Sequence, residues 1–436
     1  MKIERLVERI EGEATLVLDT SGDGSIRFAE IVFPHFRGME RILERKEALD
    51  ALAITPRVCG ICGHAHLIAT VKAMESCYEN AGYRLEVSPK AHAIRNLTLA
   101  LEIVQNHFKW FYLTLLPSVP GFEKTDDSSI LIVHKAASLC AKAIAHLAGQ
   151  WPHTSYAIPG GVMCDPTNLE LLQVESILHS LGGIFETKLL KMPLEESVHM
   201  ASAERLFESE GDLPELMRRI KSLKWERLGQ SHDRFIVLGD HLLGPSGKAL
   251  RTRISSVDPD AIDEEEPTPV QGHKNHAKVV RYRGDFYETG PLARAMVLKD
   301  PLVRGMRRRY KDASLTRIAA RMLETAKLLV RCKTILKEID LSQPSYIEPP
   351  VRLSDIDSVR GFGAVEAARG SLTHTVHLRR GKIARYCIVT PTQWNLAGGT
   401  VQRPGIAQKA LIGLPDETAA EFVFRSFDVC SVCTTQ

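Results

Sequence analysis

Apolar residues recur at helical spacing over three long stretches of this chain. Within residues 94–116 they fall at intervals of three or four, which predicts an amphipathic helix. Residues 129–150 carry a similar series on one side, and the other side is nearly as apolar. Because a helix that is apolar all round is a buried one, we expect this second helix to lie inside the protein. A third long amphipathic helix is predicted over residues 314–336.

Shorter apolar runs beside turn residues predict strands. Residues 14–18 and 26–33 flank Ser21-Gly22-Asp23-Gly24, which indicates a β-hairpin. Residues 371–389 resemble a strand, because Thr373, Thr375 and His377 alternate with His374, Val376 and Leu378. Such alternation is typical of a half-buried strand. Residues 234–287 hold short apolar runs broken by Gly and Pro, and here we expect strands and loops lying on the helices.

Three further helices are predicted, from after Glu40 to about Leu52, from the cysteines after Pro56 to Met74, and over about 415–427. Long helices with small strand regions favour a mainly helical α+β fold, a central helix bundle with peripheral hairpins and small sheets. We expect one large domain over residues 1–436. Its expected parts are an N-terminal hairpin (about 9–34), a helical core (about 61–230 and 300–340), a β-rich segment (about 234–290) and a C-terminal segment (about 365–436).

Composition narrows the class of protein. The net charge of +3 is too small to indicate a nucleic-acid surface. The first residues are too charged for a secretory signal, and no uninterrupted apolar run reaches transmembrane length. Nine cysteines scattered among helical stretches argue against a secreted disulfide framework. We therefore expect a cytoplasmic protein, with membrane association or export on a partner subunit as the alternative.

Two C-x-x-C pairs, Cys59 with Cys62 and Cys430 with Cys433, lie near opposite ends of the chain. Four thiolates at one point form a site for a soft metal. Spacing alone leaves structural zinc as the leading explanation and a thioredoxin-like redox pair as a weaker one. Zinc ribbons, however, usually place their pairs within tens of residues because they stabilise small local folds.

The surroundings of the two pairs carry a resemblance to a known family. Residues 57–66, Arg-x-Cys-Gly-Ile-Cys-x-x-x-His, resemble the N-terminal signature of nickel–iron hydrogenase large subunits, and residues 428–433, Asp-x-Cys-x-x-Cys, resemble the second signature. Six further motifs occur in the family's order. They are Arg9-Ile10-Glu11-Gly12, Phe36-Arg37-Gly38-Met39-Glu40, Trp151-Pro152-His153 with Gly160-Gly161-Val162, Glu288 to Arg294, Glu366-Ala367-Ala368-Arg369-Gly370 and Pro391-Thr392-Gln393-Trp394-Asn395.

The resemblance implies a catalytic subunit that cleaves H2 reversibly into protons and electrons. By this match Cys59 and Cys430 are terminal nickel ligands, and Cys62 and Cys433 bridge nickel to an iron that carries CO and two cyanides. A terminal thiolate such as that of Cys430 can also take a proton briefly, because its basicity depends on its environment.

Four more residues acquire roles through the resemblance. Glu11 would carry protons away from a terminal cysteine, Arg369 would face the metal centre and donate to a cyanide, and Thr392 would serve the second cyanide. Asp428 would orient Arg369. On residue type alone each has a plainer reading, as a surface carboxylate, a loop arginine, a turn residue or a helix-end carboxylate.

A magnesium site is also implied, with Glu40, the backbone carbonyl of Ile388 and a third ligand at position 436. The family usually has histidine at this third position, and this chain has Gln436, whose amide oxygen is an acceptable ligand for a hard cation. His66 is expected between the metal centre and a partner's iron–sulfur cluster. Asn106 stands where many members have aspartate. Such departures indicate a divergent subgroup.

The remaining five cysteines are isolated, which leaves no cluster motif in this chain. Electrons must then leave through an iron–sulfur small subunit, which we expect to dock near residues 59–66, with further electron-transfer subunits or a higher oligomer as an extension. An H2-sensing regulatory subunit with slow turnover is the alternative function. The related quinone-reducing subunit of respiratory complex I is disfavoured because it lacks the cysteines.

Overall fold

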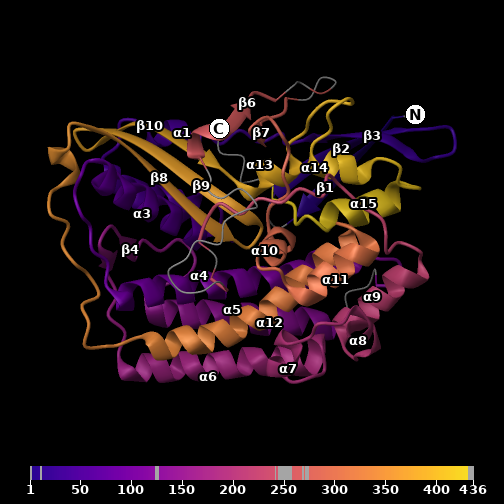
Figure 1. The fold of residues 1–436 in the computed structure, drawn as a ribbon, viewed down its shortest axis with the longest axis horizontal. Coiled ribbons are helices and arrows are strands. Elements are labelled where there is room, and N and C mark those ends of the chain that lie inside the picture. Colours follow the sequence, from indigo (N-terminus) through magenta and orange to yellow (C-terminus); the bar gives the residue numbers. More distant parts are fainter. Residues whose placement is uncertain are drawn as a thin grey trace.

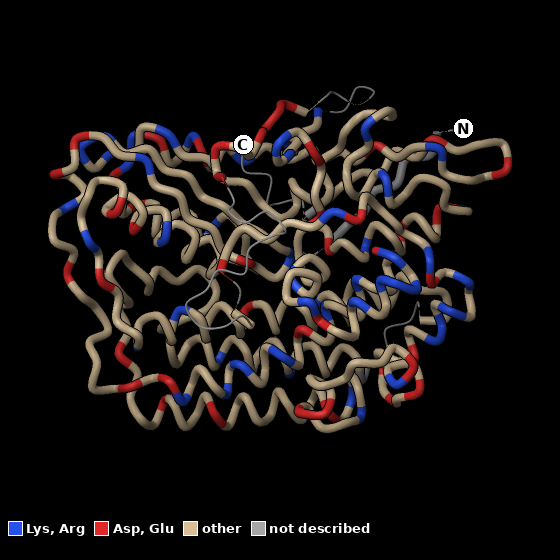
Figure 2. Tube along the Cα trace, viewed as in Figure 1, with Lys and Arg blue, Asp and Glu red and all other residues tan. Residues whose placement is uncertain are grey.

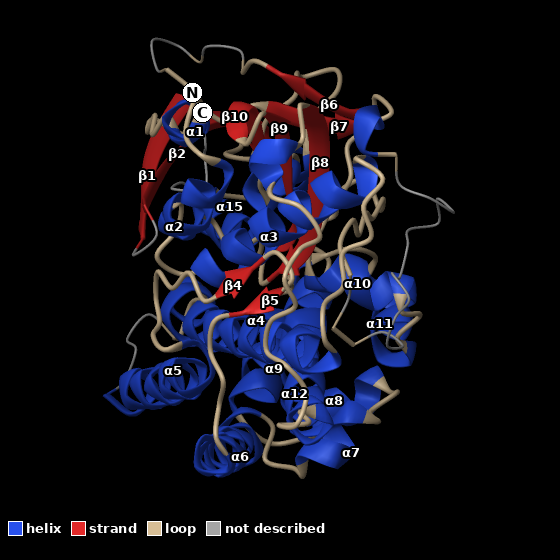
Figure 3. Cartoon of the chain, turned by 90° about the vertical axis from the view of Figure 1, so that its left-hand side faces the viewer, coloured by secondary structure: helices blue, strands red, loops and turns tan. Residues whose placement is uncertain are grey.

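The structure is a computed structural model that describes residues 2–9, 12–122, 127–240, 242–243, 258–267, 270 and 274–430, with only the backbone described for 2–9, 12–13 and 127–128. It confirms the mainly helical α+β class. Figure 1 shows a layer of long helices below a layer of small sheets and short helices. Figure 3 shows the same two layers from the side.

The lower layer is the predicted helix bundle. The three long helices predicted from periodicity are all present, and the second of them packs on a further helix that follows it in the chain. In chain order these four helices are α4 (Pro89–Lys109), α5 (Asp127–Ala148), α6 (Asn168–Ile184) and α12 (Ser314–Glu338). Helix α4 packs between α5 and α12, so it is the innermost of the four. The bundle is extended by α7 (Leu194–Val198), α8 (Ala203–Glu208), α9 (Asp212–Ser222), α10 (Pro291–Val297) and α11 (Pro301–Tyr310).

The upper layer is built on the antiparallel strands β8 (Ser358–Ala367), β9 (Gly370–Arg379) and β10 (Lys382–Val389). Helix α3 (Gly63–Asn80) lies directly on β8 and β9. This packing is close because β8 has glycines where it meets the helix. A Cβ atom on Gly361 would lie 1.9 Å from the carbonyl oxygen of Ala73. The sheet therefore presses α3, and the cysteine turn before it, into the centre of the molecule.

The N-terminal sheet pairs β1 (Lys2–Arg9), β2 (Gly12–Thr20) and β3 (Ile26–Val32) in that order. The predicted hairpin is β2 with β3, whereas β1 was not predicted. Two small hairpins complete the strands, β4 (Ala157–Ile158) with β5 (Gly161–Val162) and β6 (Ile262–Glu265) with β7 (Val279–Tyr282). The remaining helices are α1 (Met39–Leu43), α2 (Ala51–Ile54), α13 (Pro391–Leu396), α14 (Ile406–Leu411) and α15 (Glu417–Arg425).

The burial expected for the helix over 129–150 is wrong. Only one side of α5 packs between α4 and α6, and Leu131, Lys135 and Lys142 on the other side are exposed. The outer positions carry many small residues as well as lysine, and the sequence pattern did not separate the two sides. Within the described residues, Ser129–Ala148 is the one helix long and apolar enough to cross a membrane, although length and composition alone are weak grounds for a span.

Two other expectations need correction. The helix predicted from after Glu40 to about Leu52 is broken into α1 and α2, because Arg45 between them adopts a left-handed conformation with φ of 66°. The apolar run Phe235 to Leu238 forms no strand and makes only an isolated bridge from Phe235 to Glu288. Neither change alters the mainly helical α+β class.

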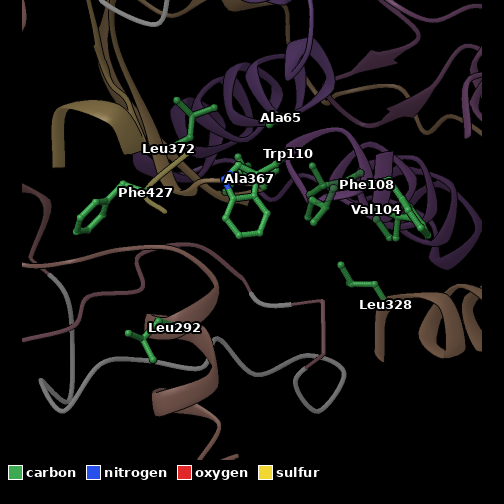
Figure 4. Close-up of a cluster of buried hydrophobic side chains, with 14 of the residues drawn as sticks. Ala65, Val104, Phe108, Trp110, Leu292, Leu328, Ala367, Leu372 and Phe427 are labelled. Carbon is green, nitrogen blue, oxygen red and sulfur yellow. The ribbon is translucent and has the colours of Figure 1, made fainter. Parts of the chain in front are cut away.

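One hydrophobic core joins the two layers. Figure 4 shows buried side chains from both layers in one cluster, among them Ala65 of α3, Phe108 of α4 and Leu372 of β9. Charged residues of both signs are spread over the described chain (Figure 2), in keeping with the small net charge. A continuous core of this kind holds the cysteine turn at a fixed place between the helices and the sheet.

Candidate metal centre

The first cysteine pair forms a buried turn just before α3. Cys59 and Cys62 are 1 % and 7 % exposed. The N–H of Ile61 donates to Sγ of Cys59 at 3.4 Å. The residue after Cys62 must be glycine, because a Cβ on Gly63 would lie 2.6 Å from the carbonyl oxygen of Pro56. The backbone of the turn therefore lies directly against Pro56, and both cysteine side chains are buried.

The second pair comes back to the first across almost the whole chain. Cys430 is fully buried, and it belongs to the same buried cluster as Cys59, Ile61 and Cys62. Cys433 lies outside the described residues. Three of the four predicted ligands are thus brought together. Within the described residues, no group of three His, Cys, Asp or Glu side chains is already arranged to hold a metal ion. Three buried thiols nevertheless make a donor set that fits a soft metal.

Arg369 and Asp428 form the ion pair expected between them. Arg369 lies in the tight turn between β8 and β9, where Gly370 has a φ of 133°. Its Nε is 3.2 Å from Oδ2 of Asp428, which stands two residues before Cys430. Both side chains are buried, at 4 % and 2 % exposure. The contact ties the β8–β9 turn to the C-terminal ligand segment.

A second arginine, Arg321, also contacts Asp428, and this contact was not predicted from the sequence. Its Nη1 donates to the same Oδ2 of Asp428 at 2.5 Å, and its guanidinium lies 4.4 Å from the ring centre of Trp110. Arg317 and Glu324 lie one turn to either side on α12. Within residues 314–326 these three are the charged residues, and their helical spacing is the signal that could have revealed Arg321.

Further buried ion pairs surround this contact. Arg317 forms a two-pronged contact with Glu288, at 2.8 Å for each prong. Arg294 contacts Glu324 in the same way, at 2.7 Å for each prong, and also reaches Glu366 at 3.2 Å. Two-pronged arginine–carboxylate contacts fix geometry as well as charge.

A cavity of about 20 Å³ lies among these arginines, and Arg369, Arg321 and Glu288 are part of its wall. Its size is that of roughly one water molecule. Positive guanidinium groups therefore line a small space beside the cysteines.

Thr392 has a buried hydroxyl with nothing to bond. The residue is 3 % exposed at the start of α13, and its Oγ1 has no hydrogen-bond partner among the described residues. A buried hydroxyl without a partner costs about 1–3 kcal/mol, so such groups are rare unless a ligand satisfies them. The side chain fits a donor to a small anionic ligand.

The predicted magnesium ligands Glu40 and Ile388 are neighbours. Oε1 of Glu40 accepts the N–H of Ile388 at 2.7 Å. Its Oε2 lies 3.5 Å from Nζ of Lys278, which is also 3.9 Å from Glu264. Desolvation by burial raises the pKa of Glu40, and the nearby Lys278 opposes this. Two carboxylates and a backbone carbonyl fit a hard cation, while Gln436 lies outside the described residues.

His66 lies inside a buried hydrogen-bonded chain. Its Nδ1 is 3.0 Å from Nε2 of His374, whose Nδ1 is 2.9 Å from the hydroxyl of Tyr386 and 3.0 Å from Oγ1 of Thr70. Burial lowers the pKa of His66 to about 4, so the ring is neutral at physiological pH. Each neutral imidazole ring has one N–H donor and one acceptor nitrogen, so all the hydrogen bonds of this series run in the same direction.

Glu102 is a second residue that the sequence analysis missed. It is a buried residue of α4, and both of its carboxylate oxygens accept backbone N–H groups at the start of α3. Burial raises the pKa of its carboxyl to about 8, and the two N–H donors act in the opposite direction. Glu11, expected to carry protons, lies outside the described residues.

Comparison with known proteins agrees with this geometry. The sequence model of one family, described as nickel-dependent hydrogenase, matches residues 37–116 and 263–436, more than half of the chain. The chain is 27 % identical over 440 residues to the coenzyme F420 hydrogenase subunit alpha of Methanothermobacter thermautotrophicus, covering 99 % of this chain and 95 % of that protein. It is 23 % identical to the periplasmic [NiFeSe] hydrogenase large subunit of Desulfomicrobium baculatum, covering 93 % and 88 %.

A solved structure shares the fold. The Ni-Fe-Se hydrogenase of D. vulgaris Hildenborough superposes with a TM-score of 0.81 at 23 % sequence identity, and each chain is covered completely. At this identity the likeness concerns the fold, and the arrangement of layers in Figure 1 is therefore that of a known architecture.

Proposed function

This chain belongs to the nickel-dependent hydrogenase family as the catalytic large subunit of a hydrogenase, and we propose that it cleaves H2 heterolytically at a Ni–Fe(CN)2(CO) centre. In this proposal Cys59, Cys62, Cys430 and Cys433 would hold the nickel, and Cys62 and Cys433 would also hold the iron. The observation that carries the proposal is the single buried cluster of Cys59, Cys62 and Cys430. A structural zinc would not require the buried arginines beside it.

The residues around the thiols have distinct tasks in this proposal. The bound nickel–iron centre supplies the electron-rich metal at which H2 is polarised. A terminal thiolate, that of Cys430, takes the proton, because thiolate basicity is set by its surroundings. Glu11 then moves the proton away, which requires a carboxyl whose pKa is close to the working pH.

Arg369 and Thr392 serve the anionic diatomic ligands. A guanidinium is always charged and donates in a fixed fork, which suits a cyanide. Asp428 holds the guanidinium by its Nε at 3.2 Å, so the remaining donors can face the ligand. Thr392 brings a buried hydroxyl that no described residue uses. Together they fix the orientation of the iron side of the centre.

We further propose that Glu40, the carbonyl of Ile388 and Gln436 hold a magnesium ion. The names of the relatives as large or alpha subunits imply a small-subunit partner, which in this proposal carries iron–sulfur clusters and docks near residues 59–66. A cytoplasmic location is proposed, and the names of the relatives include a periplasmic form.

Metal analysis combined with infrared spectroscopy of the purified complex tests the proposal. We expect one nickel and at least one iron per large subunit, with bands of one CO and two cyanides, and loss of both metals on replacing Cys430 with Ser. Replacing Cys164, which lies apart from this cluster, with Ser is the matched control and should change neither. Zinc alone, without the diatomic bands, would refute the proposal. The relatives' names describe coenzyme F420, periplasmic and uptake hydrogenases, so the sensory alternative is not favoured.

A further inference from the structure

Two polar side chains of α4 hold the backbone of the first cysteine turn. Oε2 of Glu102 accepts the N–H of His64 at 2.9 Å, and Oε1 accepts the N–H of Ala65 at 3.0 Å. One helical turn further on, Nδ2 of Asn106 donates to the carbonyl oxygen of Ile61 at 3.0 Å. These three bonds reach Ile61, between the two cysteines, and His64 and Ala65, just after them.

Glu102 and Asn106 act as a unit. They are four positions apart on one face of α4, and Nδ2 of Asn106 also donates to the carbonyl oxygen of Glu102 at 2.8 Å. Both are almost completely buried, at 1 % and 2 % exposure. The indole N–H of Trp151 lies 3.5 Å from Oε2 of Glu102 and covers its outer side. The pair is therefore rigid and shielded from water.

The bonding pattern suits a turn that has to keep its shape. The first N–H groups of a helix have no partner within the helix, and a carboxylate that accepts two of them fixes the helix start. On the opposite side the turn lies against Pro56, which leaves no room for a Cβ on Gly63. Backbone contacts therefore hold the turn on both sides, and the side chains of Cys59 and Cys62 are buried between them.

We propose that Glu102 and Asn106 are positioning residues that preorganise Cys59 and Cys62 for the metal centre. The inference rests on the proposed function. The two residues do not touch the metals in this picture. They act through the peptide groups of residues 61–65, and so determine the separation and direction of the two sulfurs before metal arrives. Sites held by such supporting bonds keep their ligands in place, and loss of a supporting group typically costs about 10- to 100-fold in metal affinity or activity.

The test compares three variants of the purified complex. Glu102→Gln keeps the size of the side chain but turns an NH2 group toward one of the two N–H donors. Asn106→Leu keeps the volume and removes the donor to Ile61. Glu170→Gln makes the same chemical change in the surface capping box of α6, where Glu170 accepts the N–H of Thr167 at 2.7 Å, and serves as the control.

Three measurements are made on each variant. Amide hydrogen exchange in peptides covering residues 58–68 should be at least tenfold faster in Glu102→Gln and Asn106→Leu. Nickel content should fall to half or less, and the CO and cyanide bands of the remaining loaded enzyme should shift. The control should match the wild type in all three. Exchange in α6 should be unchanged in the two α4 variants.

The outcomes separate this inference from the proposed function. Wild-type protein without CO and cyanide bands would remove the proposed function itself. Wild-type bands and nickel content in Asn106→Leu and Glu102→Gln, with unchanged exchange at 58–68, would overturn the positioning role alone. If Glu102→Gln does not assemble, Asn106→Leu decides the matter, because it removes the bonds of Nδ2 to Ile61 and to the Glu102 carbonyl and leaves both side-chain contacts of Glu102 with α3 in place.

Discussion

Oδ2 of Asp428 accepts a hydrogen bond from Nη1 of Arg321 at 2.5 Å, so the ligand segment at the C-terminal end is bound to the middle of α12. The same oxygen lies 3.2 Å from Nε of Arg369. One carboxylate oxygen thus aligns two guanidinium groups that come from different layers of the fold. Removing its charge should disturb both at once.

Replacing Asp428 with Asn should destabilise the protein and nearly abolish H2 turnover. Breaking a buried ion pair by removing one partner costs about 3–5 kcal/mol, because a charge stays buried without compensation. Thermal unfolding and H2 oxidation measure the two effects. The control is Asp357→Asn, which breaks a pair with Arg380 that is 83 % exposed on both sides and should cost less than about 1 kcal/mol. Equal effects of the two changes would contradict the prediction.

Replacing Thr392 with Val should leave the metal-free protein as stable or stabilise it by about 1 kcal/mol, because a buried hydroxyl without a partner is removed. In the loaded enzyme the same change should shift a cyanide band. Thr289→Val is the contrast, since Oγ1 of Thr289 donates to Ser371 at 2.9 Å and accepts its N–H at 2.8 Å. That variant should lose stability. A Thr392→Val enzyme with unaltered bands would show that the hydroxyl does not serve the centre.

Replacing Glu11 with Gln should slow H2 turnover and H/D exchange by about 100-fold or more, the usual contribution of a positioned proton carrier. The infrared bands and the nickel content should stay at wild-type values, because Gln retains the size of the side chain. Glu8→Gln, three positions earlier, is the control. Undiminished turnover and exchange in Glu11→Gln would remove the role.

Replacing Glu40 with Gln should release magnesium while nickel is retained. The carboxylate of Glu40 lies 2.7 Å from the amide of Ile388, where the second proposed ligand is the carbonyl of the same residue. Elemental analysis of the purified complex should give one magnesium per wild-type chain and close to none in the variant. Glu44→Gln, four positions later and exposed, should have no effect. Wild-type protein without magnesium would end the assignment.

Acid should destabilise the fold below about pH 6.5. Burial lowers the pKa of His107 to about 4 and that of His374 well below its usual value, so both are neutral in the folded state. The unfolded chain binds their protons first, at about pH 6.5, so the stability that these two histidines contribute is complete above that pH and falls toward pH 4. Each histidine should contribute roughly 1 kcal/mol per pH unit. Unfolding free energies at pH 7 and pH 5 measure this loss, and His134→Gln at an exposed site should leave the slope unchanged.

Periodicity predicted the bundle because the buried faces of α4 and α12 repeat at helical spacing over more than 20 residues. It failed for α5, whose outer side is made of small residues and lysine methylenes that read as apolar. It did not indicate β1, because four charged residues, Glu4, Arg5, Glu8 and Arg9, interrupt the apolar positions of this strand.

The residues of the site, like the elements of the fold, were only partly predictable from the sequence. The motifs predicted that Cys59, Cys62 and Cys430 would meet, and the structure brings them together. Arg321 and Glu102 were not predicted, because each looks like an ordinary charged residue on a helix until the fold places it against the cysteine segments. Their roles depend on tertiary contacts between α12, α4 and the two ends of the chain.

The two cysteine segments that meet at the site are synthesised at different times, because they lie near opposite ends of the chain. The first pair leaves the ribosome long before Cys430 is made, and at about 5–20 residues per second the interval is roughly 20 to 70 seconds. Throughout it two thiols stand in the turn without their later partners, open to whichever thiophilic ion is most abundant. If the four cysteines hold the metals as proposed, a cell that makes this protein has to defend a half-built site against zinc and copper during synthesis, and the order of translation becomes part of metal selection.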